Sequence, residues 1–474
     1  MVQNRTEFSH LHLGAPFGII VTGLSVVSSV WQTIHQFTKS FHNSQQEDPL
    51  KIKLLHLAGV ILVLALAVSV SFAGGYQINE HGARAVGMGG AFVARASDGS
   101  AMFFNPAGLG FQKGINLMLG TTLIMPSTTF TGPTPSTTET SMNSQTFYPS
   151  NFYASYSVGD KWVFGLGFFS PYGLGTEWPS NWVGSQLAVK TDLQTFYINP
   201  TVAYQVDDKL AFGAGLSVVL GTAKLSYNVP TVTSLLTFAP SLGTATLDGN
   251  GNGVSFDIGA LYKATDKLSI GASYRSLVKI DLKGTASFAN MQALQSFFPG
   301  GDGSVTLPMP SNFLLGASYV ISPKFTVEAD FQWVGWKSYD QLQVTLANGP
   351  ATPAGPPFFG QPLQKSPAAQ VKNWDDGYLI RIGGEYTINE KFAVRAGYIN
   401  DVSPQPPSKS EPMLPDGDRN DFSIGGSYQI NDKLHVDLAY MLVLFDERDA
   451  STAAFPGKYK SSANLLSIEL GYAF

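Results

Sequence analysis

The sequence predicts an all-β transmembrane barrel of about 14 antiparallel strands, with an N-terminal plug inside it. Apolar and polar residues alternate with period two over long stretches, a short lysine-containing turn recurs between them, and Phe474 ends the last alternating stretch. The composition agrees, because the chain of 474 residues has 13% charged residues, 12% aromatic residues and 49 glycines. Few charges with many glycines and aromatics are typical of all-β or membrane proteins.

The chain begins with two segments that we exclude from the fold. Residues 54–73 form an apolar run preceded by Lys51 and Lys53, and the run ends in Ser71-Phe72-Ala73. This pattern predicts a cleaved secretory signal peptide, and the alternative is a membrane-spanning helix. Residues 1–53 fit poorly before a signal peptide, so we interpret them as an extension that starts at a possibly mis-assigned start site.

Residues 74–113 match neither the signal peptide nor the strands. They are rich in Gly and Ala and contain the turn Asn105-Pro106-Ala107. A solvated linker is the alternative, but residues such as Phe92 and Phe103-Phe104 are too apolar for one. We therefore predict a compact plug around which residues 114–474 close as a barrel.

The alternation of residue types distinguishes an inner and an outer face on each strand. In residues 325–333, for example, Phe, Val, Ala, Phe and Trp alternate with Thr, Glu, Asp and Gln. A soluble β-sandwich gives the same alternation. A membrane barrel is favoured because the strands reach about ten residues and aromatics cluster at their ends, as an interfacial girdle requires.

The turns divide the chain into hairpins. A polar pair or triplet ending in Lys precedes a large apolar residue at residues 159–162, 207–210, 265–268, 322–325, 389–392 and 431–434. Such short turns on one rim and long loops on the other predict periplasmic and extracellular rims, with the plug on the periplasmic side. The predicted strands are 114–125, 146–157, 161–170, 194–206, 209–228, 252–264, 267–285, 312–322, 324–339, 376–389, 391–400, 419–431, 433–446 and 462–474. The predicted long loops are 126–145, 171–193, 229–251, 286–311, 340–375, 401–418 and 447–461.

Ionisable residues on one face of the predicted strands should point into the barrel, since they cannot face lipid cheaply. We expect most of them to pair with one another and with Arg84, Arg95 and Asp98 of the plug. Three arginines are possible partners for the carboxylate of a ligand: Arg275, Arg381 and Arg395. The inward-facing set is Asp257, Arg275, Glu328, Asp330, Arg381, Glu385, Arg395, Asp421, Asp437 and Glu469.

Two long loops carry apolar clusters, which predict a ligand groove on the extracellular side. The alternative is that the two loops merely pack on each other and cap the barrel. The residues concerned are Leu235, Leu236, Phe238, Leu242, Phe288, Met291, Leu294, Phe297 and Phe298.

The sequence argues against several other classes of function. After removal of the signal peptide only His81 and His435 remain, and neither lies in a Ser-His-acid pattern, so we expect no enzyme. The chain has no Cys, and we expect no cofactor and no metal. A net charge of -5 without a basic stretch argues against nucleic acid. A general hydrophilic porin stays open as an alternative.

Several motifs in order resemble one family, the outer-membrane transporters of long-chain fatty acids and aromatic hydrocarbons. The resemblance covers residues 74–474. It rests on residues 73–80 (AGGYQINE), Asn105-Pro106-Ala107, residues 170–174 (SPYGL), and residues 199–215 with Asn199-Pro200 and Gly213-Ala214-Gly215.

The resemblance implies a monomeric plugged barrel in the bacterial outer membrane that takes up hydrophobic small molecules, with long-chain fatty acids first and aromatic or aliphatic hydrocarbons as the alternative. It implies capture on the extracellular loops, passage to an interior site, and release when the plug's start (Gly74, Gly75, Tyr76 and Gln77) moves. It also implies a kink in the third strand that opens the wall to the bilayer. Glycine in a strand marks a kink or a close approach, so we place this kink at Gly165, Gly167 and Pro171, with clearance beside the plug as the alternative. The expected partners are outer-membrane lipids and, through Phe474, the barrel assembly machinery.

Overall fold

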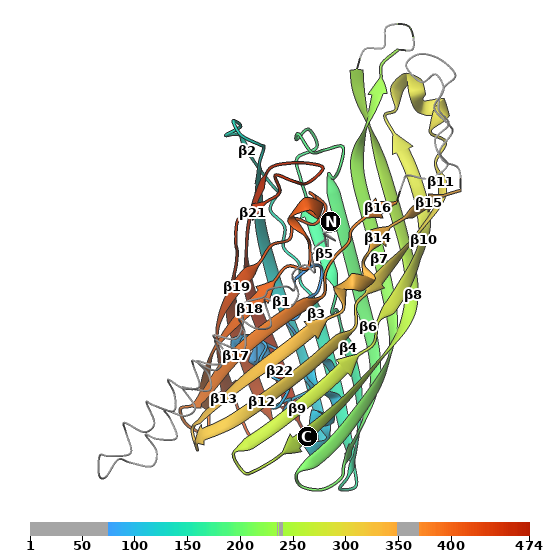
Figure 1. Ribbon diagram of the computed structural model, residues 1–474. Coiled ribbons are helices and arrows are strands. Elements are labelled where there is room, and N and C mark those ends of the chain that lie inside the picture. Colours follow the sequence, from blue (N-terminus) through green and yellow to red (C-terminus); the bar gives the residue numbers. More distant parts are fainter. Residues whose placement is uncertain (1–73, 235, 237–239, 348–368) are drawn as a thin grey trace, which may run out of the picture. The chain divides into compact units, whose positions relative to one another are not determined.

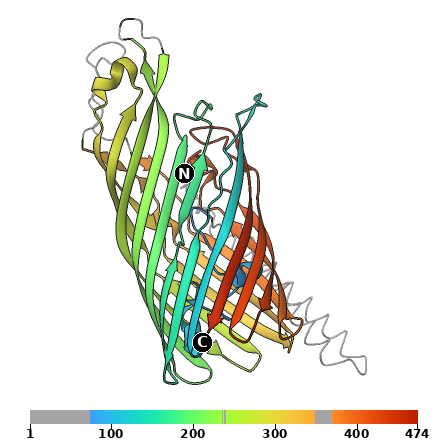
Figure 2. The ribbon, with the colours of Figure 1, turned by 180° about the vertical axis from the view of Figure 1, so that it is seen from behind.

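The computed structural model describes residues 74–234, 236, 240–347 and 369–474. The predicted extension (1–53) and signal peptide (54–73) lie outside the described residues, as do Leu235 and Phe238. The described chain forms a closed antiparallel barrel of 14 strands (Figure 1). The last strand pairs with the first from Asn116↔Ala473 to Thr131↔Lys458, and Figure 2 shows these two strands side by side. No helix among the described residues is long and apolar enough to cross a membrane.

Eleven of the barrel strands are continuous and three are divided into two segments. The continuous strands are β1 (Ile115–Thr131), β3 (Ser150–Val158), β6 (Lys190–Gln205), β7 (Leu210–Val232), β8 (Pro240–Lys263), β13 (Phe325–Val334), β17 (Gly377–Thr387), β18 (Phe392–Val402), β19 (Arg419–Gln429), β20 (Leu434–Phe445) and β22 (Lys458–Ala473). The divided strands are the third, β4 (Trp162–Phe169) with β5 (Gly173–Glu177), the seventh, β9 (Leu268–Arg275) with β10 (Val278–Ala289), and the eighth, β11 (Gly301–Met309) with β12 (Asn312–Ser322).

Short elements complete the fold. On the loop side of the barrel these are β2 (Glu139–Ser141), β14 (Gln341–Leu342), β15 (Val344–Leu346), β16 (Gln370–Val371), β21 (Arg448–Asp449), η2 (Gln292–Phe297), η3 (Trp336–Ser338) and η4 (Pro407–Lys409). Residues 74–113, which we name the luminal segment, contain α3 (Ala83–Gly87), α4 (Ala101–Phe104) and η1 (Pro106–Phe111).

The predicted number and order of strands are confirmed, but two predicted loops are wrong. Residues 229–251 were expected to form a loop, yet most of them lengthen β7 and β8, which pair from Val232↔Pro240 to Leu210↔Tyr262. Most of the predicted loop 286–311 is likewise ordered as the end of β10, η2 and β11. Figure 1 shows the resulting hairpins extending beyond the rest of the rim.

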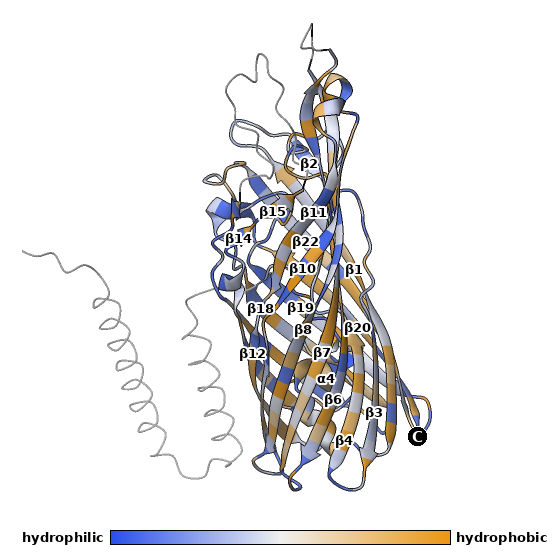
Figure 3. Ribbon diagram, turned by 90° about the vertical axis from the view of Figure 1, so that its right-hand side faces the viewer, coloured by the Kyte–Doolittle hydropathy of each residue, from blue (hydrophilic) through white to orange (hydrophobic). Residues whose placement is uncertain are grey.

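The outer face of the wall carries an apolar belt of exposed hydrophobic residues. Figure 3 shows hydrophobic residues (orange) recurring along the strands. On β7 the exposed outward residues run from Phe212 to Leu220 and then change to Thr222 and Lys224. An outward apolar run of nine residues, tilted by about 40°, is about 25 Å tall, which matches the hydrocarbon layer seen by outer-membrane barrels. The part of the β7–β8 hairpin beyond Leu220 therefore projects out of the membrane.

The recurring turn motif has a common hydrogen-bond pattern. In the turn at 207–210, the Asp207 carboxylate accepts from the backbone N–H groups of Lys209 and Leu210, at 2.8 and 2.9 Å. Asn389 and Asn431 accept in the same way from the backbone N–H groups two and three residues further on, and Thr265 does so through its hydroxyl. Asn, Asp and Thr stabilise tight turns by this local bond, which explains why the motif repeats on one rim.

The luminal segment lies against the inner wall because glycines on the strands leave room for its backbone. A side-chain carbon at Gly213 would lie 2.3 Å from Pro106, and one at Gly271 would lie 2.2 Å from the Val93 carbonyl oxygen. The Asn105 amide donates to the carbonyl oxygens of Val93 and of Ala260 on β8, at 2.9 and 3.0 Å. The motif Asn105-Pro106-Ala107 thus joins the luminal segment to itself and to the wall.

Candidate functional site

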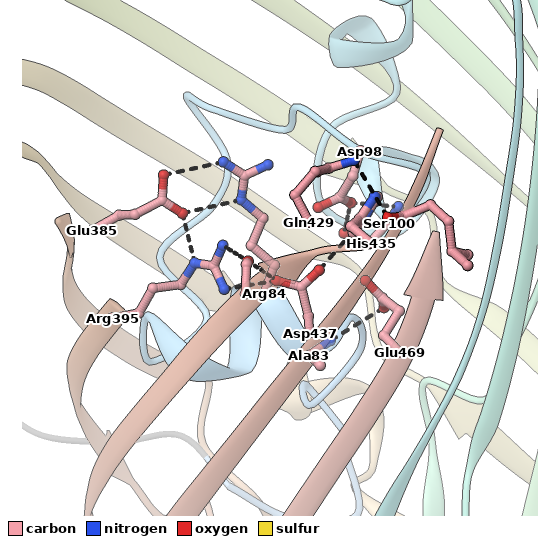
Figure 4. A network of polar contacts seen from close by, with 12 residues as sticks. Ala83, Arg84, Asp98, Ser100, Glu385, Arg395, Gln429, His435, Asp437 and Glu469 are labelled. Carbon is pink, nitrogen blue, oxygen red and sulfur yellow. Dashed lines mark hydrogen bonds and ion pairs between the residues drawn. The ribbon is translucent and has the colours of Figure 1, made fainter. Parts of the chain in front are cut away.

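The ionisable residues predicted to face inward are all buried, as expected. Glu385 accepts from Arg84 of the luminal segment and from Arg395 of β18, whose Nε lies 2.6 Å from the carboxylate (Figure 4). It also accepts from Arg95 of the luminal segment. Arg395 also pairs with Asp437 at 2.7 Å. The predicted pairing between wall and luminal segment is therefore confirmed for Arg84 and Arg95.

Acidic side chains of β13 bind the backbone of the luminal segment. The Asp330 carboxylate accepts from the N–H groups of Phe92 and Val93 at 2.7 and 3.0 Å, and Glu328 accepts from Ala94 at 2.7 Å. These bonds satisfy buried N–H groups that have no partner in a helix or strand, so they fix this part of the segment in place.

The three arginines predicted as partners of a ligand carboxylate all bond other protein groups, although Nε of Arg275 and Nε and Nη1 of Arg381 have no hydrogen-bond partner among the described residues. Their part in binding a ligand stays a prediction. Arg275 donates to the carbonyl oxygens of Phe103 and Met102, at 2.8 and 3.4 Å. Arg381 donates to Gln332, and Arg395 belongs to the ion-pair network with Glu385. None of the three lines either of the two cavities described below.

His81 joins the luminal segment to the third strand of the wall. Its Nε2 lies 3.2 Å from the carbonyl oxygen of Ser170, and its ring packs 4.3 Å from that of Phe103. Burial, assisted by the nearby Arg275 guanidinium, lowers the pKa of His81 to about 3. The imidazole is therefore neutral at neutral pH, with Nε2–H as the donor to Ser170.

This pKa shift predicts loss of stability in acid. Between the ordinary value of about 6.5 and the lowered value, the unfolded chain binds a proton at residue 81 that the folded protein does not. Stability that is fully present above pH 6.5 should therefore fall as the pH drops, by up to ~1.4 kcal/mol per pH unit. Urea unfolding, measured in detergent from pH 7 to pH 4, tests this. His81→Gln should reduce the slope of the free energy of unfolding against pH by the amount that corresponds to about one proton. An unchanged slope in His81→Gln would contradict the assignment.

The inner cavity, as we name it, is an apolar space of about 130 Å³ on the extracellular side of the luminal segment. Its walls come from β5, β6, β7, β8, β10, β11, the short strands β14 and β15, and the loop before β19. Among its lining residues are Leu174, Leu193, Leu225, Leu282, Leu307 and Leu414. The charged residues at its edge in the described part of the chain are Lys224, Asp192, Asp248 and Glu411. Lys224 and Asp248 are exposed and lie 3.8 Å apart.

The lateral cavity is larger, about 710 Å³, and lies where the third strand is interrupted. It is lined on one side by inward-facing residues such as Val443 and Leu465, and on the other by Tyr148, Phe168 and Phe196. Phe168 and Tyr148 are exposed on the outer face, and the rings of Phe168 and Phe196 stack 5.7 Å apart. The cavity therefore extends from the lumen to the outer surface of the wall.

The interruption of the third strand falls later than the sequence predicted. Gly165 and Gly167 pair regularly with neighbours on both sides, and a side-chain carbon at Gly165 would lie 2.5 Å from Met102. Their role is clearance beside the luminal segment, which was the alternative interpretation. The strand breaks at Ser170-Pro171-Tyr172, so of the three predicted residues only Pro171 lies in the break.

The start of the luminal segment fills this break. Gln77 and Tyr172 form an antiparallel bridge, in which Ile78 N–H donates to Pro171 O at 2.8 Å and Gly173 N–H donates to Tyr76 O at 2.9 Å. Tyr76 lines the inner cavity, whereas Gly75, Gln77 and Ile78 line the lateral cavity. Both cavities also share Leu174, Leu193 and Leu414. Residues 75–78 thus separate two cavities that otherwise adjoin.

Two further contacts hold this start in place. The Gly75 N–H donates to the Asp416 carboxylate at 2.9 Å, and Asp416 also accepts from the Ser403 hydroxyl at 2.6 Å. The ring of Tyr76 lies among Trp336, Tyr339 and Trp374, with centroid distances of 4.6, 5.7 and 6.2 Å. The start of the segment is therefore fixed by extracellular loops as well as by the wall.

The predicted groove residues on the extracellular loops pack on one another. Met291 is fully buried, its carbonyl oxygen accepts from Thr231, and a side-chain carbon at Gly243 would lie 2.2 Å from its sulfur. The rings of Phe288 and Phe298 lie 5.3 Å apart, while Leu236 and Leu242 are exposed. None of the described members of this set lines the inner or the lateral cavity, so their part in binding a ligand stays a prediction.

Comparison with known proteins agrees with this architecture. Residues 64–474 match the family described as outer membrane protein transport protein (OMPP1/FadL/TodX). The chain belongs to this family. It is 26% identical over 456 residues to the long-chain fatty acid transport protein of Escherichia coli O6:H1, which covers 88% of this chain and 98% of that relative. The corresponding protein of Salmonella typhi is 25% identical over 441 residues, covering 87% and 98%.

Solved structures of the family share the fold. A FadL homologue of Pseudomonas aeruginosa superposes with a TM-score of 0.73 at 19% identity, covering 85% of this chain and all of that one. The toluene transporter TodX of P. putida gives 0.65 at 19% identity, covering 86% and 99%. As a member of this family the protein is an outer-membrane transporter of fatty acids or hydrocarbons.

The sequence reasoning missed the residues that line the inner cavity. They are inward-facing aliphatic residues on the upper halves of the strands, such as Leu193 on β6 and Leu225 on β7. The alternation of residue types could have identified them. A leucine on the inner face of a strand does not contact lipid, so it indicates an apolar surface inside the barrel. The described residues contain no group of three or more His, Cys, Asp or Glu side chains that could hold a metal ion.

Proposed function

We propose that the protein moves small, uncharged hydrophobic molecules from the inner cavity to the lateral cavity and from there into the outer membrane. The luminal segment acts as a plug, and residues 75–78 act as its gate. The observation that carries the proposal is the arrangement of the two cavities, which adjoin at Leu174, Leu193 and Leu414 and are separated by residues 75–78.

The lateral exit is supported by the gap in the wall beside β5. β5 pairs with β6 on one edge only, and β3 pairs with β4 but not with β5. The ring of Phe147 fills part of this gap, since a side-chain carbon at Gly175 would lie 1.9 Å from it. Besides this ring, the Asn143 N–H donates to the carbonyl oxygen of Glu177, the last residue of β5, at 2.7 Å. A gap crossed by one aromatic side chain and one backbone bond can open at a lower cost than a full hydrogen-bonded ladder.

The size of the inner cavity supports a small cargo. An apolar cavity of about 150 Å³ binds benzene in another protein, and this one measures about 130 Å³. A single aromatic ring or a short alkane fits wholly within such a volume, whereas a long alkyl chain would have to extend beyond it.

The charges of the inner cavity support an uncharged cargo, the alternative that the sequence left open, over a fatty acid. Lys224 and Asp248 pair with each other on the exposed face, which leaves Asp192 and Glu411 as the other charged groups of the described lining. Glu411 pairs with the buried Lys372. In the lateral cavity, Lys190 pairs with Glu177 at 2.7 Å and Arg419 pairs with Asp401 at 2.6 Å. A carboxylate ligand would have to compete with these acids for a cation.

Filling the inner cavity tests the proposal. Ala223 lines the cavity from β7, and Ala223→Phe would occupy most of its volume. We expect uptake of labelled toluene, by bacteria that lack their own transporter, to fall about tenfold or more, because the cargo loses its apolar site. Labelled oleate, measured in parallel, should be taken up poorly by cells with either protein.

The matched control is Ala214→Phe, on the exposed outer face of the same strand, which should leave uptake within about twofold. Rapid uptake of oleate with no uptake of toluene would assign the protein to fatty acids. Equal uptake by Ala223→Phe and the parent would show that cargo does not pass through the inner cavity.

A further inference from the structure

The eighth strand bends between its two segments, and this bend carries several contacts to the gate. β11 ends at Met309 and β12 begins at Asn312. We name residues 308–312 the strand-eight bend. All of its residues are buried except Ser311, which is half-buried. The bend is therefore an internal part of the lumen, not a surface loop.

Both sides of the gate donate hydrogen bonds to this bend. The Tyr76 hydroxyl donates to Pro308 O at 2.5 Å and the Tyr172 hydroxyl donates to Pro310 O at 2.8 Å. Tyr76 belongs to the start of the luminal segment and Tyr172 to the break in the third strand. The two prolines thus present carbonyl oxygens to the two elements that meet at the gate.

Asn312 joins the same two elements through its side chain. Its Oδ1 accepts from Gln77 Nε2 at 2.8 Å, and its Nδ2 donates to the Tyr172 hydroxyl at 2.8 Å and to Pro310 O at 3.1 Å. Gln332 Nε2 also donates to Oδ1, at 2.5 Å. Every donor and acceptor of this buried amide is used, so its orientation is fixed.

The other end of the bend continues into the wall of the inner cavity. Val305 and Leu307 on β11 line that cavity, opposite Leu282 on the paired strand β10. A cargo that enters the inner cavity therefore contacts the strand that holds Tyr76 through Pro308. Two and four residues later, Pro310 and Asn312 hold Tyr172 and Gln77. The wall of the binding site and the attachment of the gate are one continuous piece of backbone.

We propose that the strand-eight bend is a latch that couples occupancy of the inner cavity to opening of the gate, with Asn312 as its positioning residue. The inference rests on the transport route proposed above. Cargo in the inner cavity displaces β11, and the bend then releases Tyr76, Gln77 and Tyr172 together. A ligand can shift such an equilibrium only through contacts that differ between the two states, and Val305 and Leu307 provide them.

A single cysteine can report on the gate, because the chain has none of its own. Ile78 lines the lateral cavity next to Gly173, so Ile78→Cys becomes more reactive when the gate opens. With purified protein in detergent, we expect toluene to raise the rate of labelling by a water-soluble maleimide about tenfold, within the usual range for coupled sites. In the background Asn312→Leu, labelling should be fast without toluene and rise no further.

Two variants separate latching from general damage. Tyr172→Phe removes only the hydrogen bonds of the Tyr172 hydroxyl, and Asn312→Asp keeps the acceptor for Gln77. In both variants toluene should therefore raise the labelling rate by a smaller factor than in the parent. Asn199→Leu removes another fully buried amide, which bonds Ser217 and Asp257 away from the gate, and it should keep the full tenfold response.

The outcomes distinguish the latch from the transport route. If cells take up toluene but Asn312→Leu shows the same response to toluene as the parent, the latch is wrong and the route stands. If cells do not take up toluene and toluene leaves the parent's labelling unchanged, the route is wrong and the latch falls with it.

Discussion

A disulfide between residues 77 and 172 is expected to stop transport almost completely and reversibly. The two residues face each other in an antiparallel bridge whose flanking backbone bonds are 2.8 and 2.9 Å long. In such a non-hydrogen-bonded pair the Cα atoms lie about 4.5 Å apart, which is within the range that a disulfide spans. The bond would hold the start of the luminal segment against the break in the third strand and close the route between the cavities.

The experiment uses the variant Gln77→Cys/Tyr172→Cys, in a chain that has no other cysteine. Oxidised cells should take up labelled toluene at least about tenfold more slowly than the same cells treated with a reductant. Each single-cysteine variant serves as a control that oxidation should not affect. Undiminished uptake by fully oxidised protein would mean that cargo leaves the barrel by another path.

The features of the fold that could be predicted are those that the membrane itself imposes. Lipid outside the wall requires apolar residues at every second position, and it excludes ionisable groups such as Asp330 and Glu385 from that face. These requirements act on each strand separately, so the sequence of a single strand is enough to distinguish its inner face from its outer face. The inward set was predicted without error for the same reason.

The extension of β8 could not be predicted in this way. Residues 248–253 (DGNGNG) have the composition of a turn. In the structure they continue the strand, because β10 lies so close that a side-chain carbon at Gly251 would be 2.3 Å from Asp281 O and one at Gly253 would be 2.5 Å from Val278. The glycines permit this close approach, but the element that approaches is about thirty residues away in the chain.

The site was harder to predict than the fold because it depends on partners. Arg275, Arg381 and Arg395 are cations facing a lumen, and nothing local in the sequence shows that they bond Phe103, Gln332 and Glu385. The same holds for the third strand, where Gly165 and Gly167 suggested a kink but provide clearance for Met102. The sequence shows on which face of a strand a residue lies, but it does not show which residue across the lumen that side chain contacts.

Disruption of the ion-pair network around Glu385 is expected to release the luminal segment from the wall. Its carboxylate is shared by Arg84, Arg95 and Arg395, and the Arg395 side chain is 2% exposed (Figure 4). Glu385→Gln keeps the shape of the side chain but leaves the arginines of the luminal segment without a counter-ion. Breaking one partner of a buried ion pair costs about 3–5 kcal/mol, so the luminal segment should detach from the wall far more often.

Trypsin measures this detachment directly, since Arg84 and Arg95 are themselves cleavage sites within the segment. When opening is fast relative to cleavage, the rate follows the population of the open form, and ~3 kcal/mol corresponds to a rise of about 150-fold. The matched control is Glu177→Gln, which removes the half-exposed pair with Lys190 and should change the rate by about fivefold at most. Equal cleavage rates for Glu385→Gln and the parent protein would mean that the hydrogen bonds from Phe92, Val93 and Ala94 to the β13 carboxylates are sufficient to hold the segment.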